Sequence, residues 1–176
     1  MSNTRKQLEE WLQTLEIKGT VLDVGGSAIP VKGRTKTWDV SYYDILDHRA
    51  GEGIIVRDLN EPIDFPKQYD NVFCLEVMEY VYDPRTATQN LAWFVKKGGK
   101  LYLSTHFIFP HHSGGVDCLR YTRNGITKLL TRAGLKVLSI TPRMAVDGTL
   151  ATALDKESKR QYYRGEIGHL IIAEKC

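Results

Sequence analysis

Thr20-Val21-Leu22-Asp23-Val24-Gly25-Gly26-Ser27 joins a short apolar run to a pair of glycines. Its first five residues are apolar or β-branched apart from Asp23, and two glycines follow at once. A short apolar run that ends in glycine is typical of a buried strand that turns sharply at its carboxyl end. Because glycine has no side chain, a ligand can approach the backbone of such a turn closely. We therefore predict a buried strand over residues 20–24, with a ligand-accessible loop after it.

Strand and helix patterns alternate on both sides of this stretch. The spacing of apolar residues predicts helices over residues 5–17, after Asp83-Pro84, and from Thr122 to Gly134. A polar, partly helical stretch is expected at residues 151–164. Short apolar runs predict further strands at residues 39–45, 53–57, 69–75, 100–105, 136–140 and 169–173. This alternation over short connections predicts an α/β fold of the doubly wound, Rossmann-like type, with a seven-stranded sheet and helices on both faces.

The composition is that of one ordinary soluble domain, since the 176 residues are 42% hydrophobic and 26% charged. We expect a single domain over residues 1–176, with a helix at 1–18, a ligand-binding core at 19–140, and a connection and final strand at 141–176. The first helix is either a lid over the ligand or a plain packing helix. No apolar run approaches the roughly 20 residues that span a bilayer, and the chain begins with a charged stretch. We therefore expect a cytoplasmic protein without a membrane partner.

Charge and cysteine content argue against several other classes. The net charge of +3 comes without a long Lys/Arg run, so we expect no nucleic-acid partner. The three cysteines, Cys74, Cys118 and Cys176, are odd in number and show no C-x-x-C spacing. They predict neither a disulfide framework nor a zinc site, so we expect no metal and a reducing compartment. A homodimer stays open.

Carboxylates lie at the carboxyl ends of successive predicted strands. Asp44 lies at the end of the second strand, nineteen residues past Gly25, and Asp58 and Glu76 follow the next two strands. In open α/β sheets this edge binds ligands, and a carboxylate at about that spacing holds a ribose diol. Each residue alone also fits a turn or a solvated strand end. Their occurrence at successive strand ends favours a ligand site.

Taken in order, these motifs resemble class I S-adenosylmethionine-dependent methyltransferases, in particular the small single-domain group like methyltransferase type 11. The resemblance covers about residues 19–140 and rests on the segments 21–27, 58–66, 69–81, 97–101 and 117–122. It implies that the last strand enters the sheet antiparallel to its neighbours. It also implies that the cofactor is S-adenosyl-L-methionine and that a methyl group moves to a small-molecule or glycan-like acceptor.

The same resemblance assigns residues to the cofactor. The glycine loop would pass under its methionine and ribose parts, and Asp44 would hold the ribose hydroxyls. Asp58 and Leu59 would border the adenine, while Leu75 and Glu76 would lie beside the sulfonium. The full set expected at the cofactor is Asp23, Gly25, Gly26, Ser27, Asp44, Asp58, Leu59, Leu75 and Glu76. A carboxylate-rich rim also suits a cationic sulfonium better than it suits a phosphate.

The loop after the fifth predicted strand carries three histidines, His106, His111 and His112. Methyl transfer to a hydroxyl or a protonated amine needs an aligned nucleophile and the removal of a proton. Histidine suits this task because its unperturbed pKa is near ~6.5. The resemblance points to His112 as acceptor contact or base, oriented by Asp117 or Arg120, with His106 as a further catalytic candidate. Alternatively, Asp117 and Arg120 form an ion pair that only fixes the loop.

Two other functions stay open. Ser27 and Tyr80 stand where the family usually has a glycine and often has a histidine, which favours a methyltransferase-fold module that binds S-adenosylmethionine without catalysis. A nicotinamide-dependent oxidoreductase requires G-x-G-x-x-G leading into a helix. Here Pro30 follows Gly25-Gly26 after three residues, so the sequence gives an oxidoreductase less support.

Overall fold

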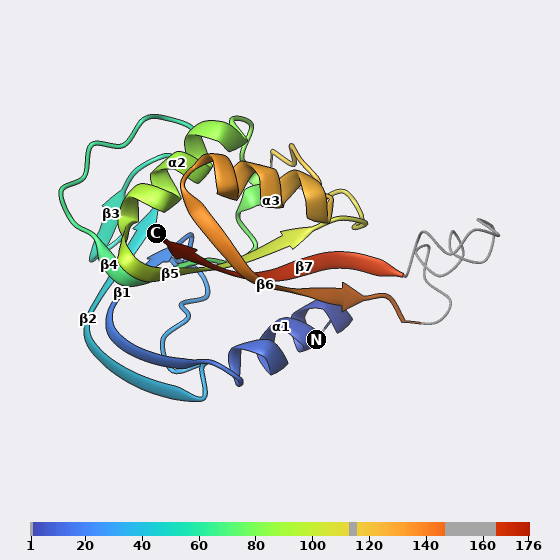
Figure 1. Ribbon diagram of the computed structural model, residues 1–176, viewed down its shortest axis with the longest axis horizontal. Helices are drawn as coiled ribbons and strands as arrows, with labels where there is room; N and C mark the ends of the chain where they lie inside the picture. The colour runs from blue at the N-terminus through green and yellow to red at the C-terminus, as the bar shows by residue number, and fades with distance from the viewer. Residues whose placement is uncertain (1, 113–115, 147–164) are drawn as a thin grey trace.

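The seven strands pair into one sheet in the order β3-β2-β1-β4-β5-β7-β6. The computed structural model describes residues 2–112, 116–146 and 165–176. In chain order the elements are α1 (Asn3–Leu12), β1 (Glu16–Val24), β2 (Thr37–Asp47), β3 (Ile54–Val56), β4 (Tyr69–Cys74), η1 (Met78–Tyr80), α2 (Pro84–Phe94), β5 (Val95–His106), α3 (Arg123–Arg132), β6 (Leu135–Met144) and β7 (Glu166–Lys175). Strands β1 to β5 pair in parallel, and β7 runs antiparallel to both neighbours. The predicted doubly wound sheet with an antiparallel last strand is confirmed (Figure 1).

Helices cover both faces of the sheet, as predicted: α2 and α3 lie on one face and α1 on the other (Figure 1). On the first face, Leu91 and Phe94 of α2 pack with Ile126 of α3 in the larger hydrophobic core. On the opposite face, Leu8 and Leu12 of α1 belong to a second core with strand residues. The sheet is therefore open to ligands at the edge where its strands end. Among the described residues, no helix is long and apolar enough to cross a membrane.

The predicted helix starts are confirmed where a capping side chain is present. Asp83 accepts hydrogen bonds from the backbone N–H groups of Arg85 and Thr86 at the start of α2. Thr122 accepts one from the N–H of Gly125 at the start of α3. These side chains satisfy N–H groups that have no partner within the helix, which is why the two helices begin at these positions.

The N-terminal segment differs from the prediction. The first helix ends at Leu12, not near residue 17, and β1 begins at Glu16. Gly19 lies within β1 with φ of +86°, where the pairing with β2 shifts register. A Cβ on Gly19 would lie 2.7 Å from a carboxylate oxygen of Asp70, so glycine is what allows the strand to bulge here.

Five strands, β1, β2, β5, β6 and β7, are longer than predicted. Strand β2 runs to Asp47, two residues past the expected end. Strand β5 begins at Val95, directly after α2, so Gly98-Gly99 lies within a strand. Residues 25–36, all of them described, form turns and bends between β1 and β2. The partly helical stretch expected at 151–164 lies outside the described residues.

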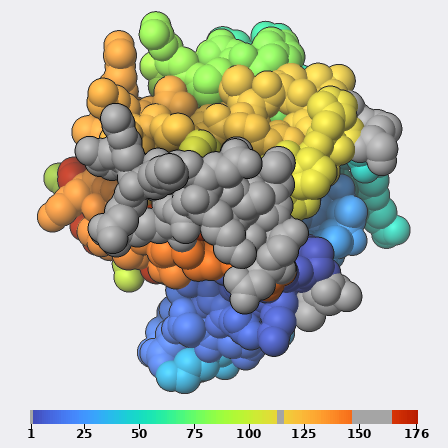
Figure 2. All heavy atoms as spheres, turned by 90° about the vertical axis from the view of Figure 1, so that its right-hand side faces the viewer, coloured from blue at the N-terminus to red at the C-terminus, as the bar shows by residue number. Residues whose placement is uncertain are grey.

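Helix α1 is attached to the end of β6. The side chains of Asn3 and Gln7 donate hydrogen bonds to the carbonyl of Met144, both at 2.9 Å, and the N–H of Met144 donates to Gln7 Oε1 at 2.7 Å. In Figure 2 the blue N-terminal residues lie directly below the orange strand residues. These hydrogen bonds show that the helix packs against the sheet, and its role as a lid stays an expectation.

Candidate functional site

A cavity of about 770 Å³ opens at the edge of the sheet where the parallel strands end. Residues that follow β1, β2, β3 and β4 build its wall, among them Gly25, Ser27, Asp47, Asp58, Leu59, Leu75 and Glu76. Arg5 of α1 and His112 also line it. Doubly wound sheets bind ligands at this edge, near the point where the strand order reverses, and the volume fits a ligand of cofactor size.

The glycine loop after β1 leaves no room for a side chain at the cavity wall. Gly25 has φ of +80°, and its N–H donates a hydrogen bond to the carbonyl of Leu46 at 2.7 Å. A Cβ on Gly25 would lie 2.3 Å from Val77 Cγ2. The backbone itself therefore forms this part of the wall, as a ligand lying against the main chain requires.

Asp23 lies beneath this loop, outside the cavity wall. It accepts hydrogen bonds from the N–H of Val31 and the hydroxyl of Tyr43, both at 2.7 Å. Burial raises the pKa of Asp23, although these two bonds act in the opposite direction. A Cβ on Gly26 would lie 2.3 Å from Asp23 Oδ2. Asp23 and Gly26 therefore shape the loop, and contrary to expectation neither lines the cavity.

The carboxylate at the end of β2 is Asp47, not the expected Asp44. Asp47 lines the cavity and accepts hydrogen bonds from the hydroxyl of Ser27 and the N–H of Arg49. Burial raises the pKa of Asp47, but these bonds outweigh burial and bring the pKa below its ordinary value. Asp44 lies inside the strand, away from the cavity wall, and accepts a hydrogen bond from the hydroxyl of Tyr69. The prediction that Asp44 lies at the end of β2 is wrong, because the strand continues to Asp47. The polar residues that begin at Asp47 are the sequence signal that marks where β2 ends.

The loop after β3 places Asp58 and Leu59 in the cavity wall, as expected, and adds Asn60 to them. Asp58 Oδ1 accepts hydrogen bonds from the N–H and the side-chain amide of Asn60, at 2.9 and 2.8 Å. Asn60 Oδ1 accepts from the N–H groups of Tyr82 and Asp83, which ties this loop to the start of α2. Nothing in the sequence marks Asn60 beyond its place two residues after Asp58.

Leu75 and Glu76 follow β4 and line the cavity, as expected. Glu76 has φ of +57°, which is uncommon for a residue with a side chain. Its carboxylate accepts hydrogen bonds from the Ser104 hydroxyl at 2.6 Å and from Arg143 Nη1 at 2.7 Å, and it lies 3.1 Å from His106 Nε2. Burial raises the pKa of Glu76, but His106 and Arg143 outweigh burial and hold the pKa well below its usual range. Glu76 is therefore a fixed negative charge at the cavity wall.

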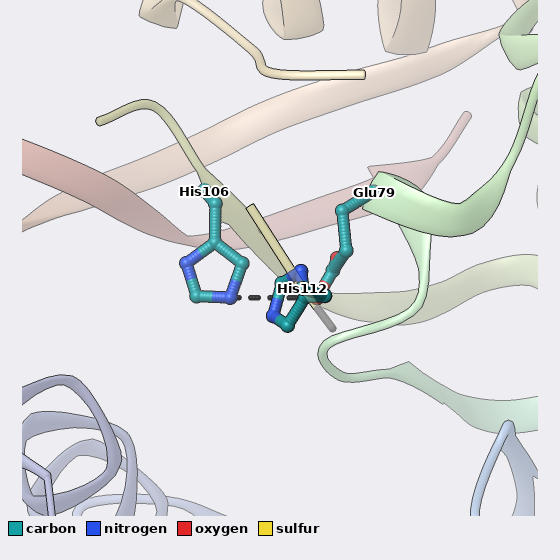
Figure 3. Close-up of side chains that lie close together, drawn as sticks. All are labelled: Glu79, His106 and His112. Atoms are coloured by element: carbon teal, nitrogen blue, oxygen red, sulfur yellow. Dashed lines mark ion pairs between the residues drawn. The ribbon is translucent and has the colours of Figure 1, made fainter. Parts of the chain in front are cut away.

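Three side chains meet close to Glu76: Glu79 of η1, His106 at the end of β5, and His112 (Figure 3). His106 Nε2 lies 3.4 Å from Glu79 Oε1. Burial lowers the pKa of His106, but Glu76 and Glu79 outweigh burial and raise the pKa to about 9. Of the three, only His112 lines the cavity. The two predicted catalytic histidines thus lie in one cluster, with His112 open to a ligand and His106 buried.

Asp117 and Arg120 form an ion pair, with Arg120 Nη2 at 2.7 Å from Asp117 Oδ2. Asp117 also accepts a hydrogen bond from the N–H of His112 at 2.8 Å, and Arg120 donates to the carbonyl of Pro110 at 3.2 Å. The hydrogen bond from Arg120 holds the pKa of Asp117 well below its ordinary value. Neither residue lines the cavity, so the pair holds the loop that carries His112. Because Asp117 also contacts His112, this arrangement agrees with both sequence expectations, the loop-fixing ion pair and the orientation of His112.

Among known proteins, relatives match only part of the chain in sequence. No protein-family model matches it. A ubiquinone biosynthesis O-methyltransferase from Klebsiella pneumoniae is 36% identical over 63 residues, which are 33% of this chain and 26% of that protein. The match therefore spans about a quarter of the relative's length.

Similarity to solved structures extends over almost the whole chain. An S-adenosylmethionine-dependent methyltransferase from Mesorhizobium loti has a TM-score of 0.68 at 15% identity, with 98% of each chain covered. The [4+2]-cyclase SpnF has a TM-score of 0.61 at 13% identity, with 98% of this chain and 80% of that chain covered. The resemblance to class I S-adenosylmethionine-dependent methyltransferases is confirmed, and the chain has their Rossmann-like fold.

Proposed function

We propose that this chain binds S-adenosylmethionine in the cavity and transfers its methyl group to a small-molecule or glycan-like acceptor. One observation carries the proposal: Gly25 leaves no room for a side chain at a wall that also presents the carboxylates of Asp47, Asp58 and Glu76. A cationic sulfonium is attracted to these carboxylates, which share the cavity wall with four arginines, Arg5, Arg34, Arg49 and Arg57. When bound, the cofactor supplies a methyl group that its sulfonium has already activated for displacement.

Each part of the cofactor has a matching part of the wall. We assign the ribose hydroxyls to Asp47, because its place at the end of β2 is that of the diol-binding carboxylate in doubly wound folds. Asp58 and Leu59 border the adenine, and Glu76 faces the sulfonium end. Ser27 contributes through its hydrogen bond to Asp47, which fixes the direction of that carboxylate.

His112 is our candidate for acceptor contact or proton removal. It lines the cavity, and Asp117 holds its main chain in place. The name of the Klebsiella relative, an O-methyltransferase, supports a hydroxyl acceptor. In that reaction an oxygen–carbon bond forms as the carbon–sulfur bond breaks, and the hydroxyl proton passes to a base.

Calorimetric titration with S-adenosylhomocysteine tests cofactor binding. We expect one site per chain with a micromolar Kd, and we expect Gly25→Val to abolish binding because the new side chain collides with Val77. Gly33→Val is the matched control, since Gly33 has a similar φ of +76° but no atom within 4 Å of an added Cβ and no place in the cavity wall. Failure of the unaltered chain to bind at millimolar ligand would contradict the proposal.

A second candidate function is cofactor binding without methyl transfer. SpnF, which is named a cyclase, shares this fold, so the fold alone does not specify the reaction. Turnover against a panel of phenols, alcohols and amines separates the two candidates. We expect a methylated product, and we expect His112→Ala to slow its formation by about 100-fold while S-adenosylhomocysteine affinity stays within about twofold. Binding with no product across the panel favours the second candidate.

The nicotinamide alternative gains no support from the site. A dinucleotide pyrophosphate binds at the N-terminus of a helix that directly follows the glycine loop. Residues 25–36 contain no helix, so that binding position is missing. Titration with NADH is accordingly expected to give no heat of binding.

A further inference from the structure

Glu79 carries a buried carboxylate without a hydrogen-bond partner. The residue belongs to η1 and is 1% exposed. Neither of its carboxylate oxygens makes a hydrogen bond to a described residue. A buried carboxylate is strongly unfavourable unless a cation or hydrogen-bond donors compensate its charge. Glu79 therefore marks a place where a cation is favoured.

Two imidazoles lie beside this carboxylate (Figure 3). One ligand atom from each of Glu79, His106 and His112 lies within 4.8 Å of the other two. Within this cluster, His106 Nε2 lies 3.4 Å from Glu79 Oε1. Two histidines and one carboxylate form a donor set that binds Zn²⁺ in catalytic sites.

We propose that Glu79, His106 and His112 bind one divalent transition-metal ion of the Zn²⁺ type. Metal–ligand bonds of about 2.0–2.1 Å in a tetrahedral site place neighbouring ligand atoms about 3.4 Å apart. The His106–Glu79 separation already equals this value. Closing the widest separation, 4.8 Å, requires a shift of little more than an ångström. His112 can supply this shift by rotating its ring, since its side chain is 24% exposed.

Charges on the Glu76 side of the cluster favour a cation. Glu76 faces His106 at 3.1 Å and forms an ion pair with Arg143 at 2.7 Å. Glu79 has no guanidinium partner among the described residues. A divalent ion bound between Glu79 and His106 would compensate the charge of this carboxylate.

The other side of the cluster orients His112. Asp117 Oδ2 accepts a hydrogen bond from the main-chain N–H of His112 at 2.8 Å and lies 3.4 Å from His112 Nδ1 without a hydrogen bond to that atom. Arg120 neutralises Asp117, so Asp117 does not compete as a free carboxylate. Because His112 lines the cavity, the fourth coordination position opens toward a ligand there. A catalytic use of the metal rests on the proposed methyl transfer, whereas metal binding itself does not. With His112 bound to the ion, the ion as a Lewis acid, and not the imidazole as a base, would activate the acceptor hydroxyl.

Calorimetric titration of the EDTA-treated, dialysed chain with ZnCl₂ tests the site. We expect one Zn²⁺ per chain with a micromolar or lower Kd. Glu79→Gln and His112→Gln are each expected to weaken binding by more than about tenfold. His111→Gln is the matched control, because His111 is the exposed neighbour of His112 and does not belong to the cluster. The zinc X-ray absorption spectrum is expected to show nitrogen and oxygen ligands, two of them imidazoles.

Three results would overturn the proposal: no Zn²⁺ binding at about 100 µM metal, binding that survives both substitutions, or a sulfur ligand in the absorption spectrum. Circular dichroism of each variant shows whether it is folded. If Glu79→Gln does not fold, His112→Gln still decides, since it changes a partly exposed side chain. Cofactor binding is measured in a separate titration with S-adenosylhomocysteine. If the chain binds zinc but not S-adenosylhomocysteine, the proposed function is wrong and the metal site is supported. If it binds S-adenosylhomocysteine but not zinc, only the metal site is wrong.

Discussion

Asp44 and Asp47 both lie on β2, but only Asp47 lines the cavity. Asp47 lines the cavity beside Ser27, whereas Asp44 lies within the strand and accepts a hydrogen bond from Tyr69. We expect Asp47→Asn to weaken S-adenosylhomocysteine by about tenfold or more, because a charge-assisted hydrogen bond to the ribose is lost. Asp44→Asn keeps an acceptor for Tyr69 and is expected to leave the affinity unchanged. Calorimetric titration of both variants measures the difference, and equal losses would refute the assignment of the ribose.

Single residues also show what the sequence can predict about the site. Gly25, Asp58 and Glu76 are predictable, because each follows a short apolar run within two residues and therefore lies near a strand end. Asp47 is harder to predict, because Asp44 interrupts the apolar part of β2 before Ile45 and Leu46, and only the polar residues from Asp47 onward mark the end of the strand. The contact of Glu76 with Arg143 joins residues 67 positions apart, so it depends on the finished sheet and on no local pattern.

At the scale of elements, Asp70 joins β1, β4 and β5 at the bulge around Gly19. Its carboxylate accepts hydrogen bonds from the N–H and the hydroxyl of Thr20, at 2.8 and 2.7 Å, and from Lys96 Nζ at 3.0 Å. Burial raises the pKa of Asp70, but Thr20 and Lys96 outweigh burial and lower the pKa to about 2. Because the unfolded value is about 3.9, this carboxylate contributes its full stability above about pH 4, and the contribution is lost as the pH falls through about 2.

Asp70→Asn is expected to destabilise the protein at pH 7, by an amount that shrinks as the pH falls toward 2 and disappears below it. The loss at pH 7 is expected to stay below about 1 kcal/mol, since the side chains of Asp70 and Lys96 are each 42% exposed. Urea denaturation of both proteins at several pH values measures it, and Asp39→Asn, at an exposed position on β2, controls for the change in net charge. A difference that stays constant down to pH 2 would show that the carboxylate charge is not the cause.

At the scale of the whole molecule, Arg143 connects three parts of the chain that are distant in sequence. It lies on β6, and its Nη1 donates to Glu76 at the cavity wall at 2.7 Å. Its Nη2 donates to the carbonyl of Thr4 in α1 at 2.8 Å. The N-terminal helix, the cavity and the C-terminal half of the sheet therefore meet at one guanidinium, whose side chain is fully buried. The order of helices and strands is predictable from the sequence, but this junction forms only when the separate elements have packed.

Arg143→Met is expected to lower the free energy of unfolding by about 3 kcal/mol, because it leaves the Glu76 carboxylate without its guanidinium partner. Arg123→Met is the matched control: its ion pair with Glu166 is also 2.7 Å long, but Arg123 is 43% exposed, so we expect a loss below about 1 kcal/mol.

Adding Glu76→Gln to Arg143→Met is expected to restore part of the stability, because the uncompensated charge is gone. Denaturant titration of the three variants and the unaltered protein measures these differences. Equal losses at Arg143 and Arg123, or no recovery in the double variant, would show that the junction is held by packing and not by its buried charges.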